Sequence, residues 1–488
     1  MTFHEKSSGK RRIWTFRTLA ILSGFLLLAI LEIALRIAGF TPSPDVQDPY
    51  ISFEDNPVLF VKDDSGEYYQ TAENRLAFFR EQRFPVEKSP DAFRIFVLGG
   101  STVQGRPYSV KTAFPAWLKI NLEAAQPDRK FEVINCGGVS YASYRLIPIM
   151  KEILEYEPDL FILYTGHNEF LEERSYGRIK DAPPIVKNLM KIRTVALFRK
   201  IMFAGKEDST PENGKLTLPA EVDARLDYED GLENFEREPE LRNDIISHFE
   251  SNVEEMILMS EEAGVPLILV NPVSNLKDSP PFKSAFRKSM SEQERTKVNS
   301  LWKEAEEIDW DRNAEKIALL EKALELNPKH AELFFSTGKA YERMGRFDEA
   351  KENFIQAKDA DIAPLRILEP MHHVLIDLSR EHDIIFVDAR ELFEEKSPGG
   401  IPGDEMLLDH VHPDIEGHQI IADAIFEKLI EKNFFQAPEN WKEAQNRLRK
   451  RHLESLDEVY FQKGAMRHQR LKEWSRGRIP EDARIIQD

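Results

Sequence analysis

The hydrophobic positions of this chain fall into short unbroken runs that alternate with longer amphipathic stretches. Short runs rich in β-branched and aromatic residues predict strands buried on both faces, as in a parallel sheet. The stretches 114–125 and 146–156 carry apolar residues at helical spacing and predict helices. The predicted strands are Phe93–Leu98, Phe131–Asn135, Leu160–Tyr164, Pro266–Val270 and Ile384–Val387. This alternation predicts an α/β domain with helices on both faces of a parallel sheet.

The N-terminal segment is a long apolar run behind a basic cluster of Lys10, Arg11 and Arg12. Roughly 20 mostly apolar residues suffice to cross a bilayer as a helix. No clear small-residue cleavage site follows, which favours an uncleaved signal anchor over 13–38. The positive-inside rule then predicts that 1–12 is cytoplasmic and that the rest lies on the periplasmic, extracytoplasmic side of the membrane.

Proline, charge and repeat patterns divide the remainder of the chain. A basic amphipathic stretch at 186–203 fits a surface helix on the core, a lid or a helix on the membrane surface. The C-terminal segment is charged and predicted to be helical, and its sequence indicates no chemistry. The predicted segments are a stalk (39–90), the α/β domain in two parts (91–298 and 363–432), an insertion (299–362) and the C-terminal segment (433–488).

The insertion carries the small and aromatic positions of a tetratricopeptide unit, which is about 34 residues long. These positions in the later copy are Phe334, Gly338, Tyr341, Ala350, Phe354 and Ala357. Leu320 and Ala323 stand one period earlier, but the first half of that copy fits poorly. The insertion contains fewer than the roughly three repeats that independent stability needs. We therefore expect it to be stabilised by packing against the α/β domain. A structural insert and a partner-binding surface both fit this pattern.

Charge and cysteine content exclude some classes of protein. The net charge of -19 argues against a nucleic-acid partner, since phosphate binding needs a basic surface. Cys136 is the only cysteine, which rules out an intramolecular disulfide. The paired histidines at 372–373 and 410–412 lack a convincing set of further ligands, so we expect no metal and no cofactor.

Candidate chemistry begins where the first predicted strand ends. Gly99 and Gly100 form a tight turn that lifts Ser101 out of the sheet edge, where a hydroxyl can meet a substrate and a base. Ligands of parallel sheets bind at this carboxyl edge. A turn serine that caps the next helix is the alternative. The spacing of Gly100 and Gly105 resembles a phosphate loop, but the Lys-Ser/Thr pair that a phosphate loop requires is absent.

A base and its orienting carboxylate lie near the end of the α/β domain. His412 can remove the Ser101 proton, and Asp409 can hold the imidazole in the right tautomer. Pro413 suits the start of a helix that would fix both side chains. Alternatives are that Asp409 caps this helix, or that His410 or His418 is the working histidine, although His418 is expected to pack inside the helix.

Acyl transfer also needs hydrogen-bond donors for an oxyanion. Asn168 supplies a side-chain amide from the loop after Leu160–Tyr164, unless it merely caps that loop. The N–H of Ser101 is a second donor. A third is expected from the loop after the second strand, at Gly138 or Ser140.

Together these blocks resemble the GDSL/SGNH hydrolase superfamily. Residues 99–102 resemble its nucleophile block, 166–169 its asparagine block and 409–412 its Asp-x-x-His block. The resemblance implies a three-layer α/β/α fold and ester hydrolysis. The combination of anchor, hydrolase core and repeat also resembles a bacterial membrane-anchored subgroup, which the segment 275–280 fits too. The chain departs from the family where Gly100 replaces the usual Asp and Glu169 follows Asn168 in place of Asp.

Two functions are weighed on this basis. The first is a membrane-anchored serine esterase or acyltransferase that acts on acylated envelope carbohydrate or lipid. The second is a membrane-tethered binding or assembly protein that uses 299–362 to dock a protein partner. A core kept only as scaffold has no need of the full set of Ser101, Asn168, Asp409 and His412, which favours the enzyme.

Overall fold

The computed structural model describes residues 51–174, 216–228 and 230–474, with isolated positions between 23 and 34. The chain divides into two compact units. The first comprises Met1–Glu54 and Ser175–Leu218, and its described part is a parallel pair of β1 (Ile51–Phe53) and β8 (Leu216–Leu218). The second comprises Asp55–Arg174 and Pro219–Asp488, and it contains every candidate site residue.

The centre of the second unit is a five-stranded sheet in the order β10-β9-β7-β5-β6. All of its neighbouring strands run parallel, which confirms the predicted α/β architecture. Gly99 at the end of β5 lies in register with Gly137 of β6 and Tyr164 of β7, so these carboxyl ends meet at one edge. The strands are β5 (Ala92–Gly99), β6 (Lys130–Gly137), β7 (Leu160–Tyr164), β9 (Leu267–Asn271) and β10 (Ile385–Asp388).

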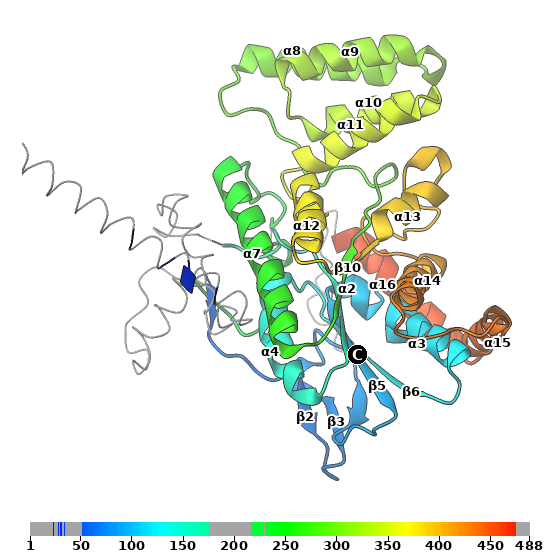
Figure 1. The fold of residues 1–488 in the computed structure, drawn as a ribbon. Helices are drawn as coiled ribbons and strands as arrows, with labels where there is room; N and C mark the ends of the chain where they lie inside the picture. The colour runs from blue at the N-terminus through cyan, green and yellow to red at the C-terminus, as the bar shows by residue number, and fades with distance from the viewer. Residues whose placement is uncertain are drawn as a thin grey trace, which may run out of the picture. The chain divides into compact units, whose positions relative to one another are not determined.

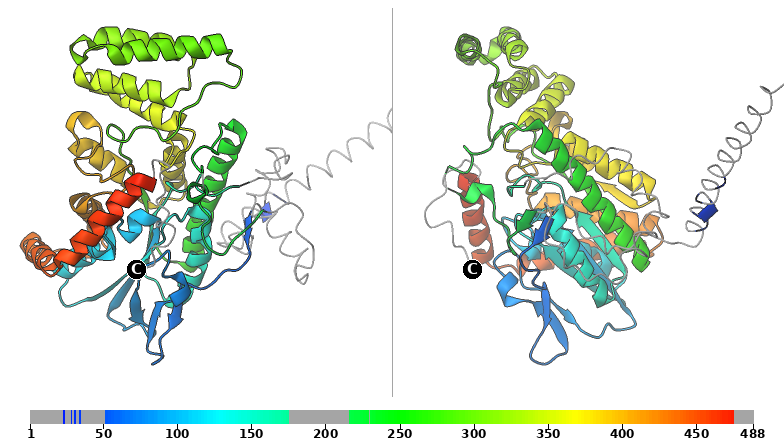
Figure 2. Two further views of the ribbon diagram at one scale, coloured as in Figure 1. Left: turned by 180° about the vertical axis from the view of Figure 1, so that it is seen from behind. Right: turned by 90° about the vertical axis from the view of Figure 1, so that its left-hand side faces the viewer.

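Helices cover both faces of this sheet (Figures 1 and 2). On one face lie α3 (Phe114–Ala125), α13 (Ala389–Lys396), α14 (Ile415–Glu431) and α15 (Trp441–Glu454). On the other lie α4 (Ser143–Ile153), α7 (Pro239–Ala263) and α12 (Glu369–Glu381). Alternate strand residues serve the two layers: Ile95 and Val97 pack in one core cluster with Trp117 of α3 and Ile421 of α14.

A small antiparallel sheet corrects the expectation of a stalk over 39–90. It consists of β2 (Phe60–Lys62), β3 (Tyr68–Thr71) and β4 (Arg83–Pro85). Phe84 is buried, and its ring packs edge to face on Phe96 of the central sheet with centroids 5.6 Å apart. Residues 60–85 are therefore folded onto the α/β domain.

The insertion consists of two helical hairpins, at the top of Figure 1. Successive helices pack on one another, and Phe354 fills the space beside Gly338, where an added Cβ would lie 2.8 Å from its ring. The helices are α8 (Glu292–Glu307), α9 (Asn313–Leu326), α10 (Ala331–Arg343) and α11 (Phe347–Ala360). The first helix thus begins before residue 299, the boundary expected from the repeat pattern.

The C-terminal segment packs onto the α/β domain. In α15, Gln445 donates to Asn121 of α3 at 2.8 Å. The last described helix, α16 (Glu458–Trp474), packs on the segment that follows α2 (Ser101–Gln104), where the Tyr460 hydroxyl lies 2.8 Å from Oγ1 of Thr112. Gly464 is needed there, because a Cβ would lie 2.1 Å from the ring of Tyr108.

The predicted anchor at 13–38 falls outside the described residues, apart from isolated positions, and so does the amphipathic stretch 186–203. Within the described part of the chain, no helix combines the length and the apolar character needed to cross a bilayer.

Candidate active site

The turn after β5 is fixed by two close approaches of backbone. A Cβ at Gly99 would lie 2.1 Å from the carbonyl oxygen of Tyr164, so only glycine fits. A Cβ at Gly100 would lie 2.6 Å from Nδ2 of Asn168. A side chain at position 100 would therefore displace Asn168, which favours glycine there. Ser101 follows as the first residue of α2, and it is partly accessible.

Ser101, His412 and Asp409 form one hydrogen-bonded series. The Ser101 hydroxyl donates to Nε2 of His412 at 2.7 Å, and the two residues are 311 positions apart in the chain. On the other side of the ring, Nδ1–H donates to Oδ2 of Asp409 at 2.7 Å. Oδ1 of Asp409 also accepts from the backbone N–H groups of Val411 and His412, both at 2.9 Å. The structure thus brings together the predicted nucleophile, base and orienting carboxylate.

The environment of Asp409 keeps it ionised. Burial by itself would raise the pKa of this carboxyl, but the charge of His412 and its hydrogen bond lower the pKa well below its ordinary value. An ionised Asp409 accepts from Nδ1–H, which leaves Nε2 of His412 free to accept the Ser101 proton.

The alternatives for the loop are resolved by its contacts. Asp414, rather than Asp409, caps α14, because its Oδ1 accepts from Gly417 N–H at 2.7 Å. His418 lies inside α14, and its Nδ1 accepts from Phe114 N–H at 3.3 Å. The ring of His410 packs edge to face on Phe282 with centroids 5.0 Å apart. Burial lowers the pKa of His410 to about 4 and that of His418 to about 3, so both rings are neutral.

The loop from Leu408 to His412 is also tied to neighbouring segments. Leu408 N–H donates to the His412 carbonyl at 2.8 Å, which closes the loop on itself. Thr102, the residue after Ser101, donates through Oγ1 to the Val411 carbonyl at 3.4 Å. Asn275 N–H donates to the His410 carbonyl at 3.0 Å. These contacts hold the imidazole in position opposite Ser101.

Three N–H groups are candidates to bind an oxyanion, and one prediction needs correction. Asn168 uses one amide N–H for the Tyr141 carbonyl at 2.9 Å and retains a second beside Gly100. The Ser101 N–H belongs to the first turn of α2, which has no intrahelical acceptor. Gly138 N–H is already bonded to the Gly99 carbonyl at 3.0 Å and is not free. Ser140 has a left-handed φ of 62°, and no described residue accepts from its N–H, so it remains the loop donor.

Glu169 supports the Asn168 loop in a way that the sequence did not indicate. Its side chain is fully buried and accepts from Ser143 N–H at 2.7 Å and from Ser143 Oγ at 3.0 Å. These bonds tie the loop to the start of α4. The Glu169 side chain is long enough to reach this helix end.

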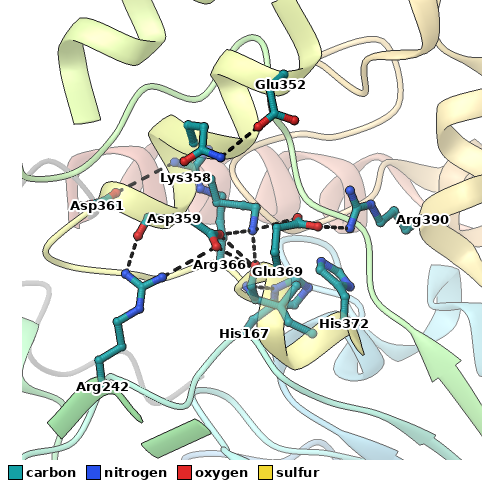
Figure 3. A network of polar contacts seen from close by, with 12 residues as sticks. His167, Arg242, Glu352, Lys358, Asp359, Asp361, Arg366, Glu369, His372 and Arg390 are labelled. Carbon is teal, nitrogen blue, oxygen red and sulfur yellow. Dashed lines mark hydrogen bonds and ion pairs between the residues drawn. The ribbon is translucent and has the colours of Figure 1, made fainter. Parts of the chain in front are cut away.

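A polar network at the end of the insertion includes His167, the residue before Asn168 (Figure 3), and reaches the segment at 275–279. Lys358 of α11 donates to the Ile367 carbonyl at 2.7 Å, and Ile367 N–H donates to Nδ1 of His167 at 3.2 Å. Arg366 donates to the carbonyls of Asn275 at 2.9 Å and Ser279 at 2.8 Å. Sequence reasoning missed Arg366, and the signal for it was a charged residue inside the apolar run 362–368.

Among the described residues, no group of three or more His, Cys, Asp or Glu side chains is arranged to hold a metal ion. The expectation that the site needs no metal or cofactor stays a prediction.

Comparison with known proteins identifies the repeat. Residues 319–352 match the tetratricopeptide repeat family, which confirms the repeat predicted within the insertion. A search of curated proteins gives no match to this chain.

Solved structures show only distant likeness. An acetylxylan esterase from Geobacillus stearothermophilus is 12% identical, with a TM-score of 0.31, over 69% of this chain and 94% of that one. A G-D-S-L family protein from Desulfitobacterium hafniense is 11% identical, with a TM-score of 0.30, over 69% of this chain and 99% of that one. TM-scores this low decide neither the fold nor the activity, for which the geometry of the site is the guide.

Proposed function

We propose that this chain hydrolyses or transfers acyl groups of oxygen esters, with Ser101 as the nucleophile. The observation that carries the proposal is the pair of 2.7 Å hydrogen bonds on either side of the His412 ring, to Ser101 and to Asp409. Nucleophile, base and orienting carboxylate within hydrogen-bond reach of one another are the arrangement that activates a serine.

The reaction proceeds in two stages. Ser101 Oγ attacks the ester carbonyl while its proton passes to Nε2 of His412, and the resulting oxyanion is bound by Asn168 and by the N–H groups of Ser101 and Ser140. His412 then gives the proton to the leaving alcohol as the ester C–O bond breaks, which leaves an acyl-serine. Water, or a second alcohol in acyl transfer, then attacks the acyl carbonyl and gives its proton to His412. His412 returns this proton to Ser101 Oγ as the bond between Oγ and the acyl group breaks, and the acid or the new ester leaves.

We further propose that residues 13–38 anchor the chain so that the site lies outside the cytoplasm. The basic residues before this apolar run support that orientation. Acylated envelope carbohydrate or lipid is then the substrate class that fits the location.

A second function is supported by the repeat match at 319–352. In that case the chain would be a tethered binding or assembly protein, and the insertion would bind a protein partner.

Covalent labelling separates the two functions. The full chain in detergent micelles is treated with a fluorophosphonate, and the adduct is located by mass spectrometry beside Ser101→Ala and His412→Ala. A single adduct on Ser101 that both variants lose, with all three proteins folded by circular dichroism, is the expected result. A folded wild type without an adduct would contradict the proposal and favour the binding protein.

A further inference from the structure

Arg106 follows the nucleophile helix α2, and its side chain has no partner among the described residues. Its backbone N–H donates to the Ser101 carbonyl at 3.1 Å, so the residue is anchored to the turn that carries Ser101. Nε of its guanidinium is enclosed and has no hydrogen-bond acceptor, while the residue as a whole keeps partial access to solvent. No described residue forms an ion pair or a side-chain hydrogen bond with it.

Other buried arginines in the described part of this chain are paired. Nε of Arg94 donates to Glu132 at 2.7 Å, and Nε of Arg145 donates to Glu172 at 2.6 Å. An enclosed cation costs free energy unless it is paired. None of the described residues supplies that partner for Arg106, which makes a bound anion its candidate partner.

The surroundings of Arg106 add positive charge and lie at the candidate site. Arg467 of α16 donates to the Tyr108 carbonyl at 2.8 Å, two residues along from Arg106. The next residue, His468, bonds to the carbonyl of Leu408, which precedes Asp409. Helix α16 thus contacts both the segment that follows Ser101 and the segment that precedes His412.

The electrostatics agree with this placement. Burial, and then the charges of Arg80 and Arg467, lower the pKa of Arg106 to about 10, while the carboxylates of Asp409 and Asp227 act in the opposite direction. Arg106 remains a cation at neutral pH, held close to like charges. The nearby carboxylate of Asp409 is already bonded to His412.

We propose that Arg106 binds an anionic group of the substrate, so that the ester attacked by Ser101 belongs to a negatively charged molecule. A planar guanidinium suits the oxygen pairs of a carboxylate, sulfate or phosphate. The net charge of -19 repels anions from the protein as a whole. An anionic substrate therefore requires a local cation beside the site, which Arg106 provides. This inference rests on the proposed esterase function.

The test compares esters matched except for charge. One pair is an O-acetylated oligouronate and the same oligomer after its carboxylates are reduced to alcohols, and the other is diacetylglycerol phosphate and diacetylglycerol. The first pair reports an acidic carbohydrate source and the second a phosphate headgroup. We expect kcat/KM to favour the anionic member of one pair by about ten- to a hundredfold, as a charged hydrogen bond provides, and the preference to fall with added salt.

Variants test whether Arg106 is the residue responsible for the charge preference. Arg106→Gln should remove most of the preference and Arg106→Lys part of it, because lysine keeps the charge but not the planar fork. Arg129→Gln is the matched control, since Arg129 lies against Phe93 and Phe435 before β6, at the opposite end of the strands. If Arg106→Gln fails to fold, the charge preference of the wild type and its salt dependence still decide.

Fluorophosphonate labelling of the wild type comes first and separates the two proposals. A labelled wild type that shows no charge preference in either pair, or an Arg106→Gln variant that keeps the preference, overturns the anion site alone. An unlabelled wild type overturns both the esterase and the anion site.

Discussion

Ser101 and His412 meet across a 2.7 Å hydrogen bond, yet the segments that carry them are held by different kinds of contact. Ser101 sits at the end of β5, between two parallel neighbours, where Gly99 allows the backbone to approach Tyr164. His412 sits on an irregular loop whose carbonyls accept from Thr102, Asn275 and His468. The first position is set by the sheet and the second by single bonds from distant parts of the chain.

This difference predicts that the position of His412 is easier to disturb by mutation than the position of Ser101. Sheet register cannot change by a small amount, because a slip of one residue turns every side chain to the other face. A loop held by single hydrogen bonds can shift when one of them is lost, and a shift of about 1 Å can cost 10²-fold in rate. We therefore expect variants around the His412 loop to lose activity without losing the fold.

The largest effect is expected from Asp409→Asn. The amide oxygen can keep the bonds from Val411 and His412 N–H, but the NH₂ group then faces Nδ1 of His412. That forces Nδ1 to accept and puts the proton on Nε2, the wrong tautomer for deprotonating Ser101. We expect kcat to fall by roughly 10⁴ with little change in the thermal midpoint. Steady-state kinetics on an aryl acetate checks this, and a loss below tenfold would mean that Asp409 does not orient the base.

A smaller loss is expected from Asn168→Ala. The change removes an oxyanion donor that acts only when charge develops, so kcat should fall by roughly 10²–10³ and KM should change little. The Tyr141 carbonyl also loses its bond from Nδ2. Thermal unfolding beside the kinetics separates this structural cost from the catalytic one. A kcat within a fewfold of wild type would leave the oxyanion to the backbone N–H groups alone.

Local patterns predicted the parts of the site that depend on local structure. The strands at 93–98 and 160–164 and the turn at Gly99–Ser101 follow from short apolar runs that end in glycine, and the structure has them at those residues. The bond between Gly138 N–H and the Gly99 carbonyl could not be predicted, because it depends on the register of β5 and β6. That bond is the reason Gly138 fails as a donor.

Contacts between distant parts of the chain could not be predicted from the sequence for a related reason. Arg366 and Asn275 are 91 residues apart, and α16 meets Tyr108 across more than three hundred residues. Neither contact produces a periodic pattern of hydrophobic residues that could be recognised in the sequence. The small sheet at 60–85 was missed because its strands are only three or four residues long and carry charged neighbours.

Arg366→Met tests whether the segment that follows the insertion helps to position the His412 loop. The change leaves the carbonyls of Asn275 and Ser279 without their buried donor, which should cost about 1–3 kcal/mol of stability. Because Asn275 N–H holds the His410 carbonyl, we also expect kcat to fall by about tenfold to a hundredfold.

The matched control for this change is Arg242→Met. Arg242 bonds the Asp359 carbonyl at the same junction, without a contact to the 275–280 segment (Figure 3). Equal kcat values for the two variants at 25 °C, with both proteins folded, would show that the junction is structural only.

The smallest effect concerns pH and compares a histidine of the scaffold with the one on the loop. Burial lowers the pKa of His418 from 6.5 to about 3, so the folded state keeps the ring neutral while the unfolded chain binds a proton. Between these values the unfolded state holds more protons, so the free energy of unfolding falls as pH falls, by up to about 1.4 kcal/mol per unit from this group. His418→Gln, whose amide oxygen can still accept from Phe114 N–H, should flatten that slope between pH 6 and 4. Urea unfolding at several pH values measures this slope.

The activity of His418→Gln is the control. Because His418 bonds Phe114 and not Ser101, kcat at pH 8 should be retained. A large loss of kcat would mean that the position of the His412 loop depends on α14 as strongly as on its own hydrogen bonds.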